Sequence, residues 1–130
     1  MKQYIYIDAS DGDGLINNFT YDFQDNILIK KGTLRLLSFT AKFSEVSTLD
    51  NLFIESEIFK GFNTKKGGNS NISQPILFDS NVATATYVHC REQQPVYFEN
   101  HFGIIKFRII KSDMNIASLT SAKFVIEISD

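Results

Sequence analysis

The sequence has few cysteines, prolines and glycines and a small net charge, and each of these features disfavours a class of protein. Cys90 is the only cysteine in 130 residues, so no intrachain disulfide can form and a reducing compartment is expected. Tryptophan is absent, and two prolines and seven glycines are too few for a disordered or collagen-like chain. A net charge of −2 provides no basic field, so direct nucleic-acid binding is not expected.

Long hydrophobic runs are also missing. No segment approaches the roughly 20 apolar residues that a membrane-spanning helix needs. The N-terminal segment alternates apolar and polar residues and then becomes charged, whereas a signal peptide has an uninterrupted apolar stretch and a small-residue cleavage site. The sequence therefore predicts a soluble protein made in a cytoplasm, without membrane insertion.

Apolar side chains for a core are plentiful. Twelve phenylalanines and five tyrosines are present. A chain of this length buries roughly two thirds of its unfolded surface, which is enough for a core without cross-links. We predict one domain that spans residues 1–130.

The longest strand-like stretch without a breaker is residues 33–43. From Leu37 to Phe43, apolar and polar residues alternate, which predicts a strand with one buried face. Leu34 and Leu36 are apolar on the opposite phase. This change of phase predicts either a β-bulge near Leu36 and Leu37 or a strand whose first half is covered on both faces.

Further short strands are predicted along the rest of the chain. Alternation or β-branched composition marks residues 3–8, 19–23, 27–29, 76–78, 83–90, 96–98, 105–109 and 122–128. With the central stretch, this makes about eight or nine strands at spacings of roughly 8 to 20 residues, without strand–helix alternation. The pattern predicts an all-β sandwich or barrel. Residues 112–121 form a polar excursion in which Ile116 and Leu119 are expected to turn inward.

Residues 44–61 fit two structures. One is a loop followed by a strand through residues 52–54, with a continuation towards Phe59. The other is a helix with Ser47 as its N-cap and Gly61 after its last turn. We favour the strand. The next stretch, residues 62–73, is polar and glycine-rich and predicts a mobile loop.

The residues that commonly bind metals do not form a metal-binding pattern. His89 and Cys90 are adjacent, and His101 lies twelve residues further on. Neighbouring side chains on a strand point to opposite faces, so His89 and Cys90 cannot easily share one ion. Residues 9–14 resemble the start of a calcium-binding loop, but alanine and threonine occupy its first and twelfth ligand positions. We predict an acidic turn and no metal site.

Catalytic motifs are equally absent from the sequence. There is no Gly-x-Ser-x-Gly elbow, and the Lys-Lys-Gly-Gly segment at 65–68 lacks Walker spacing, so a solvated surface loop is expected there. Glu55 and Glu57 share one face if their stretch is a strand, and we expect them to form a solvent face or one side of a subunit contact. The sequence predicts no catalytic or cofactor-binding residues, and a protein that is not an enzyme.

The order of the features along the chain is more informative than any motif. A first strand ends in Asp-Ala-Ser at 8–10, Asn-Phe-Thr-Tyr-Asp-Phe at 18–23 leads to an Ile-x-Ile piece and a basic turn, and the long strand follows. Beyond it come Asn-Leu-Phe-Ile-Glu-Ser at 51–56, a polar loop before Pro-Ile-Leu-Phe at 75–78, and Phe-Val-Ile-Glu-Ile at 124–128. This order resembles the small single jelly-roll capsid proteins of icosahedral DNA viruses with double jelly-roll major capsids, namely the penton and minor capsid proteins of virophages, giant-virus relatives and lipid-containing phages.

The resemblance implies an eight-stranded single jelly-roll sandwich of two antiparallel sheets. It also implies a virion structural protein, a penton that assembles as a homopentamer at the vertices among major capsid proteins. The chain has room for only one jelly roll, so the major capsid protein itself is not expected. Many pentons carry a spike domain or a long arm, and this sequence shows neither, which keeps a minor or cement capsid role open.

A second class of function is a carbohydrate-binding or receptor-ligand β-sandwich module. Tyr4 and Tyr6 share a face of the first strand and can form an aromatic platform, although they can equally pack against a neighbouring strand or subunit. The last two strands are expected to present mixed charge to a neighbour through Lys106, Arg108, Lys123 and Glu127.

Overall fold

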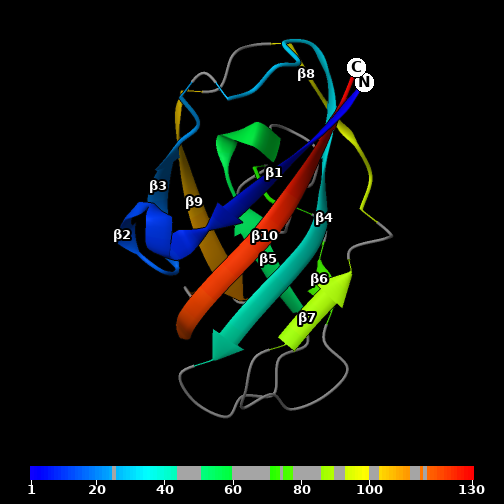
Figure 1. Ribbon diagram of the computed structural model, residues 1–130. Coiled ribbons are helices and arrows are strands. Elements are labelled where there is room, and N and C mark those ends of the chain that lie inside the picture. Colours follow the sequence, from blue (N-terminus) through cyan, green and yellow to red (C-terminus); the bar gives the residue numbers. More distant parts are fainter. Residues whose placement is uncertain are drawn as a thin grey trace.

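The chain folds as a β-sandwich (Figure 1). The computed structural model describes residues 1–24, 26–43, 51–59, 71–73, 75–77, 86–89, 93–99, 103–111, 115 and 117–130. In these ranges, strands form two antiparallel sheets, and the helical elements are the short 3-10 turns η1 (Ala9–Asp11) and η2 (Glu57–Phe59). The sheets face each other across a shared hydrophobic core. The all-β prediction is confirmed.

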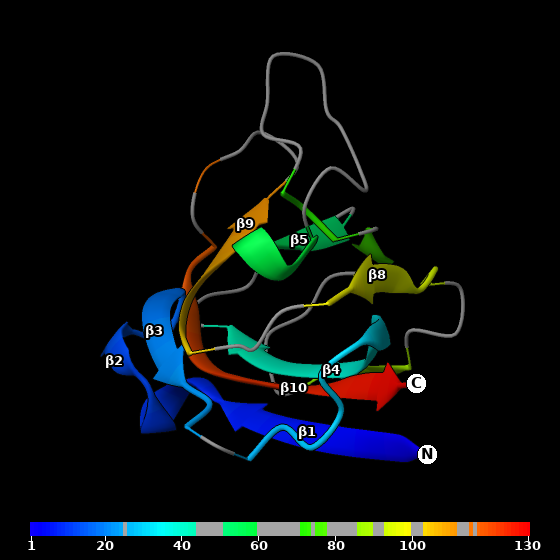
Figure 2. The same cartoon turned by 90° about the horizontal axis from the view of Figure 1, so that it is seen from above.

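The first sheet contains the longest strands and both ends of the chain. Its order is β1-β10-β4-β7, and β8 also pairs with β4. The bounds are β1 (Lys2–Asp8), β10 (Leu119–Ser129), β4 (Gly32–Phe43), β7 (Thr86–His89) and β8 (Val96–Phe98). Figure 2 shows β1, β10 and β4 on one side of the sandwich and β9 and β5 on the other.

The second sheet has the order β2-β3-β9-β5-β6. The bounds are β2 (Asp13–Leu15), β3 (Asn18–Asp22), β9 (Ile104–Lys111), β5 (Asn51–Glu55) and β6 (Ile76–Leu77). The acidic segment of the sequence forms η1 and the start of β2, as a turn between the first sheet and the second. Gly14 adopts a φ of +123° in the β2–β3 hairpin, a conformation that favours glycine.

The strand order is that of a jelly roll. β7 and β8 pair with successive parts of β4, residues 38–41 and 32–34, and so occupy one interrupted strand position. β2 extends the sheet beyond β3 as one arm of a hairpin. The remaining pattern, β1-β10-β4-β7/β8 facing β3-β9-β5-β6, has eight strand positions in two sheets of four. The predicted single jelly-roll sandwich is confirmed.

The phase change in the central strand is a β-bulge. Ser38 of β4 lies opposite Val125 of β10, and Leu36 lies opposite Ile126, so Leu37 has no residue of its own opposite it on β10. Because of the inserted residue, the apolar side chains on both halves of β4 point towards the core. The buried apolar side chains of this strand are Leu34, Leu36, Phe39, Ala41 and Phe43. A bulge, rather than a strand covered on both faces, therefore explains the pattern.

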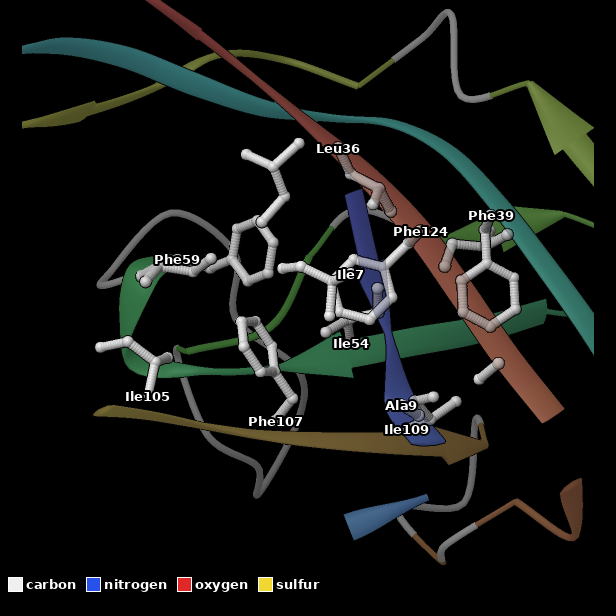
Figure 3. Packing of buried hydrophobic residues seen from close by; sticks show 14 of the residues in the cluster. Ile7, Ala9, Leu36, Phe39, Ile54, Phe59, Ile105, Phe107, Ile109 and Phe124 are labelled. Carbon is white, nitrogen blue, oxygen red and sulfur yellow. The ribbon is translucent and has the colours of Figure 1, made fainter. Parts of the chain in front are cut away.

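Stacked aromatic rings connect the two sheets through the core (Figure 3). Phe39 of β4 and Phe124 of β10 lie nearly parallel with ring centroids 6.4 Å apart. Phe107 of β9 meets Phe124 edge-on at 5.3 Å and stacks on Phe19 of β3 at 5.5 Å. All four rings are at most 2% exposed. Such contacts add roughly 0.5–1.5 kcal/mol per pair beyond the burial of the rings.

Residues 44–61, for which the sequence allowed a strand or a helix, contain the strand β5. The predicted helix is absent from residues 51–59, the part of this stretch that the structure describes. β5 pairs with β6 and β9, but it ends at Glu55 and is followed by η2, so the predicted continuation towards Phe59 is wrong. Phe59 is buried nonetheless. Residues 44–50, 60 and 61, with Ser47 and Gly61, lie outside the described residues.

The end of the predicted loop 62–73 is part of the sheet. Ile72 is buried and forms a bridge with Glu55. Ser73 donates its backbone N–H to the Ile54 carbonyl at 2.9 Å, and its hydroxyl accepts from the Ile54 N–H at 3.0 Å. Residues 62–70 lie outside the described residues, and so do Phe78, Cys90, His101 and Ile116.

The connection between β3 and β4 closes the side of the sandwich next to β1. Ile27 and Ile29, predicted as a short extended piece, are buried although their segment is not a strand. The Gln3 side chain holds this segment: its amide N–H donates to the Asn26 carbonyl at 2.5 Å, and its oxygen accepts from the Leu28 N–H at 2.9 Å.

Candidate functional site

A groove lies on the outer face of the first sheet. Its volume is about 660 Å³, which lies in the range of small-molecule sites. The groove runs over β1, β10 and β4. It is lined by Tyr4, Tyr6, Ile7, Asp8, Asp11, Leu37, Ser38, Thr40, Lys123, Phe124 and Val125.

Strand alternation places two tyrosines at the rim of this groove. Ile7 of β1 is buried and Ile5 packs against the core, so the alternate residues Tyr4 and Tyr6 face outward. Tyr4 is 47% exposed and Tyr6 is 76% exposed. The predicted shared face of Tyr4 and Tyr6 is therefore confirmed, and both residues line the groove from the edge strand.

The β4 bulge shapes the groove on the side away from β1. Leu37 and Ser38 both line the groove, although they are consecutive residues of one strand. Consecutive residues share a face only where the pleat is interrupted, which the unpaired position at Leu37 provides. The bulge thus adds an apolar side chain to the outer face of the sheet.

Charged groups lie at the end of the groove near η1. Asp8 accepts hydrogen bonds from the Ser10 backbone N–H at 3.0 Å and from the Ser10 hydroxyl at 2.8 Å. Lys123, its cross-strand neighbour on β10, lies 3.9 Å away. The Ser10 backbone hydrogen bond is the main cause that lowers the pKa of Asp8 below its ordinary value, and the Ser10 hydroxyl and Lys123 add to it.

A partly buried ion cluster lies on the same face of the sheet. Glu127 of β10 is only 8% exposed, and its carboxylate lies 3.1 Å from Arg35 Nε and 3.9 Å from Lys2 Nζ. The prediction that Glu127 lies on an exposed side of its strand is wrong, because Arg35 of β4 and Lys2 of β1 flank its buried carboxylate. The four predicted charges also do not form one surface, since β9 with Lys106 and Arg108 belongs to the second sheet.

The predicted glutamate pair lies beside a smaller hollow of about 210 Å³ on the second sheet. Glu55 on β5 receives a hydrogen bond from Arg108 Nη1 at 2.7 Å, so its carboxylate is engaged in an ion pair. Glu57 belongs to η2 and not to the strand, so the two carboxylates do not share a strand face. Lys106 also lines the hollow. The group is a mixed-charge surface and not a matched acid–base pair.

The residues weighed as metal ligands are not brought together in the described ranges. His89 lies in β7, while Cys90 and His101 fall outside those ranges. Among the described residues, no group of three or more histidine, cysteine, aspartate or glutamate side chains has a geometry that could hold a metal ion. The same part of the chain contains no helix that is long and apolar enough to cross a membrane.

No protein-family model, curated protein sequence or solved structure significantly matches this chain. What the groove can bind is therefore inferred from the residues that line it. Two exposed rings, an apolar side wall and flanking charges suit contact with a flat or ring-shaped surface.

Proposed function

We propose that this chain is a non-enzymatic structural protein of a virion, a penton protein that closes the vertices among double jelly-roll major capsid proteins. In this role it binds further copies of itself in a homopentamer and contacts the major capsid protein. It neither binds nucleic acid directly nor inserts into a membrane. After synthesis in the host cytoplasm it resides in the virion.

The observation that carries the proposal is the strand order, β1-β10-β4-β7/β8 facing β3-β9-β5-β6. This is the fold implied by the resemblance of the sequence to small capsid proteins. A fold alone hosts many functions, so the surface must also suit the role.

The arrangement of charges supports a contact surface rather than a reaction centre. Glu55 is paired with Arg108, and Glu127 with Arg35. Paired charges of this kind set the register of neighbours more than they supply acid or base catalysis. The broad outer face of the first sheet offers a surface on which a stable contact, about 800 Å² per partner, can form.

Native mass spectrometry of the purified chain tests the proposal. A pentamer that persists on dilution is the expected result. A trimer would contradict the penton role and favour a receptor-ligand module. A monomer would also contradict it, and would favour a minor or cement capsid protein that associates only with the assembled shell.

The groove with Tyr4 and Tyr6 favours a second candidate, a carbohydrate-binding module. Exposed aromatic rings beside hydrogen-bonding groups suit the apolar face and the hydroxyls of a sugar. A glycan array probed with the parent protein and with Tyr6→Ala tests this candidate. Tyr97→Ala is the matched control, because Tyr97 is 57% exposed but lies on β8, away from the groove. Binding that is lost only in Tyr6→Ala would favour the module, and no binding by the parent would contradict it.

A further inference from the structure

β1 is an edge strand of the first sheet. It pairs with β10 along all seven of its residues, and the strand order places no other strand beside it in the described part of the chain. Exposed sheet edges present unpaired backbone N–H and C=O groups, which can add a further strand. The composition of β1 determines which strand would fit.

One hydrogen bond shows which residues of β1 direct their backbone to the open edge. The Met1 carbonyl accepts from the Asp130 N–H at 3.3 Å, one position beyond the β1–β10 ladder. In an antiparallel pair, every second residue directs both its backbone groups to the partner strand, and the residues between direct theirs away. Odd-numbered residues of β1 therefore bond to β10, and the even-numbered residues, with Tyr4 and Tyr6 at the centre, direct their N–H and C=O groups to the open edge.

We propose that this edge pairs antiparallel with β1 of a second copy of the chain, with the two Ile5 residues facing each other on a twofold axis. Tyr4 and Tyr6 flank Ile5, and Lys2 and Asp8, which carry opposite charges, lie three residues to either side of it. In this register, Tyr4 lies opposite Tyr6 of the second copy, and Lys2 lies opposite Asp8 of the second copy. Aromatic pairs and opposite charges are the cross-strand combinations that stabilise a sheet. A shift of the register by two residues would lose both charge pairs.

The neighbouring strands extend this charge complementarity. Within one copy, Asp8 lies beside Lys123, and Lys2 lies 3.9 Å from Glu127. Across the proposed contact, four side chains form a row in which positive and negative charges alternate. The row contains Lys123 and Asp8 of one copy, followed by Lys2 and Glu127 of the other. The twofold axis creates this row twice. Because the contact uses the same patch on both copies, it is closed and stops at two copies.

The segment at residues 26–28, which passes near the edge of the sheet, leaves the outward backbone groups of β1 available for a further strand. Asn26 and Leu28 are bonded to the side chain of Gln3. In the described ranges, no backbone hydrogen bond joins that segment to β1. The edge at Tyr4 and Tyr6 therefore keeps its N–H and C=O groups for a partner.

Charge variants at Lys2 test the pairing without changing Asp8, which also caps η1. The association constant is measured by sedimentation velocity for the parent, Lys2→Met and Lys2→Glu. Lys2→Met removes the attraction between Lys2 and Asp8 of the second copy, and should weaken association. Lys2→Glu places two carboxylates opposite each other at both symmetry-related pairs, and should weaken association further, by about tenfold or more relative to the parent. Lys106→Glu is the matched control, because it changes the net charge equally on the second sheet, and it should leave association unchanged. The double variant Lys2→Glu with Asp8→Lys should restore association if it folds.

The outcomes separate this contact from the proposed fivefold assembly. A dimer that Lys2→Glu dissociates supports the pairing and contradicts the penton role. A decamer that Lys2→Glu splits into pentamers supports both. A pentamer that is insensitive to Lys2→Glu overturns the pairing and leaves the penton role intact. A monomer at every concentration, or an association that Lys106→Glu weakens as much as Lys2→Glu does, overturns the pairing.

Discussion

Phe39 is the residue whose loss should damage the fold most clearly. Its side chain is 0% exposed, and its ring stacks on Phe124 across the central strand pair. Phe39→Ala removes the ring from a position that the bulge in β4 fixes, and the neighbouring strands cannot close the gap without shifting their register. Buried Phe-to-Ala changes cost about 3–5 kcal/mol from lost burial and the cavity left behind. A domain of this size is stable by only about 5–15 kcal/mol, so the variant should fail to fold or melt far below the parent.

Urea denaturation, followed by circular dichroism or by tyrosine fluorescence, measures the free energy of unfolding. Because the chain has no tryptophan, its tyrosine emission can be observed directly. Phe39→Leu is the companion variant that should still fold, with a loss of roughly 1–2 kcal/mol. Tyr97→Ala removes an aromatic ring from an exposed position and should change the free energy of unfolding by no more than about 0.5 kcal/mol. If Phe39→Ala lost less than about 1 kcal/mol, the register of β4 and the packing of the aromatic core described above would be incorrect.

Three further predictions concern polar groups and backbone fit. Arg35→Ala should lower the free energy of unfolding by about 1–3 kcal/mol in urea titrations, because it leaves the buried Glu127 carboxylate with one weak partner. The lowered pKa of Asp8 means that its contribution to stability is present above about pH 4 and is lost as the pH falls through the folded pKa. Ser10→Ala removes the hydroxyl hydrogen bond but keeps the larger backbone one, so in an NMR titration it should move the pKa only part of the way back towards 3.8. Gly32→Ala should cost about 1–3 kcal/mol in thermal melts, because a Cβ at this position would collide with the main chain at the end of β10.

Side-chain periodicity revealed the strands and the faces they bury. Phe19, Phe107 and Phe124 are spaced by alternation within their own strands, and each is buried as the alternation predicts. The bulge at Leu37 was one of two explanations that the reversal of phase in this apolar run allowed, and the β4–β10 register decided between them. The strands and their buried faces are local features, so the sequence around them is sufficient.

Pairing between distant strands was not predictable from the same signal. Glu127 alternates as an outward-facing residue, and only the β4–β10 register places Arg35 directly opposite it. The ordering of Ile72 and Ser73 likewise depends on their contacts with β5. Their local composition, Asn-Ile-Ser within a polar stretch, gives no sign of it.

One side of the groove was predictable from the sequence, and the other side was not. The shared face of Tyr4 and Tyr6 follows from alternation in β1. Its other walls come from Leu37 and Lys123, which reach the tyrosines only through the order β1-β10-β4. That order joins the first strand to the last, and nothing in a local pattern determines it.

Electron microscopy of the purified, negatively stained chain tests the central claim most directly, because a penton must form a closed ring around a fivefold axis. Class averages that show rings of five jelly-roll units are the expected result. Uniform threefold rings, or isolated particles of the size of one 14.8 kDa chain at every concentration, would contradict it.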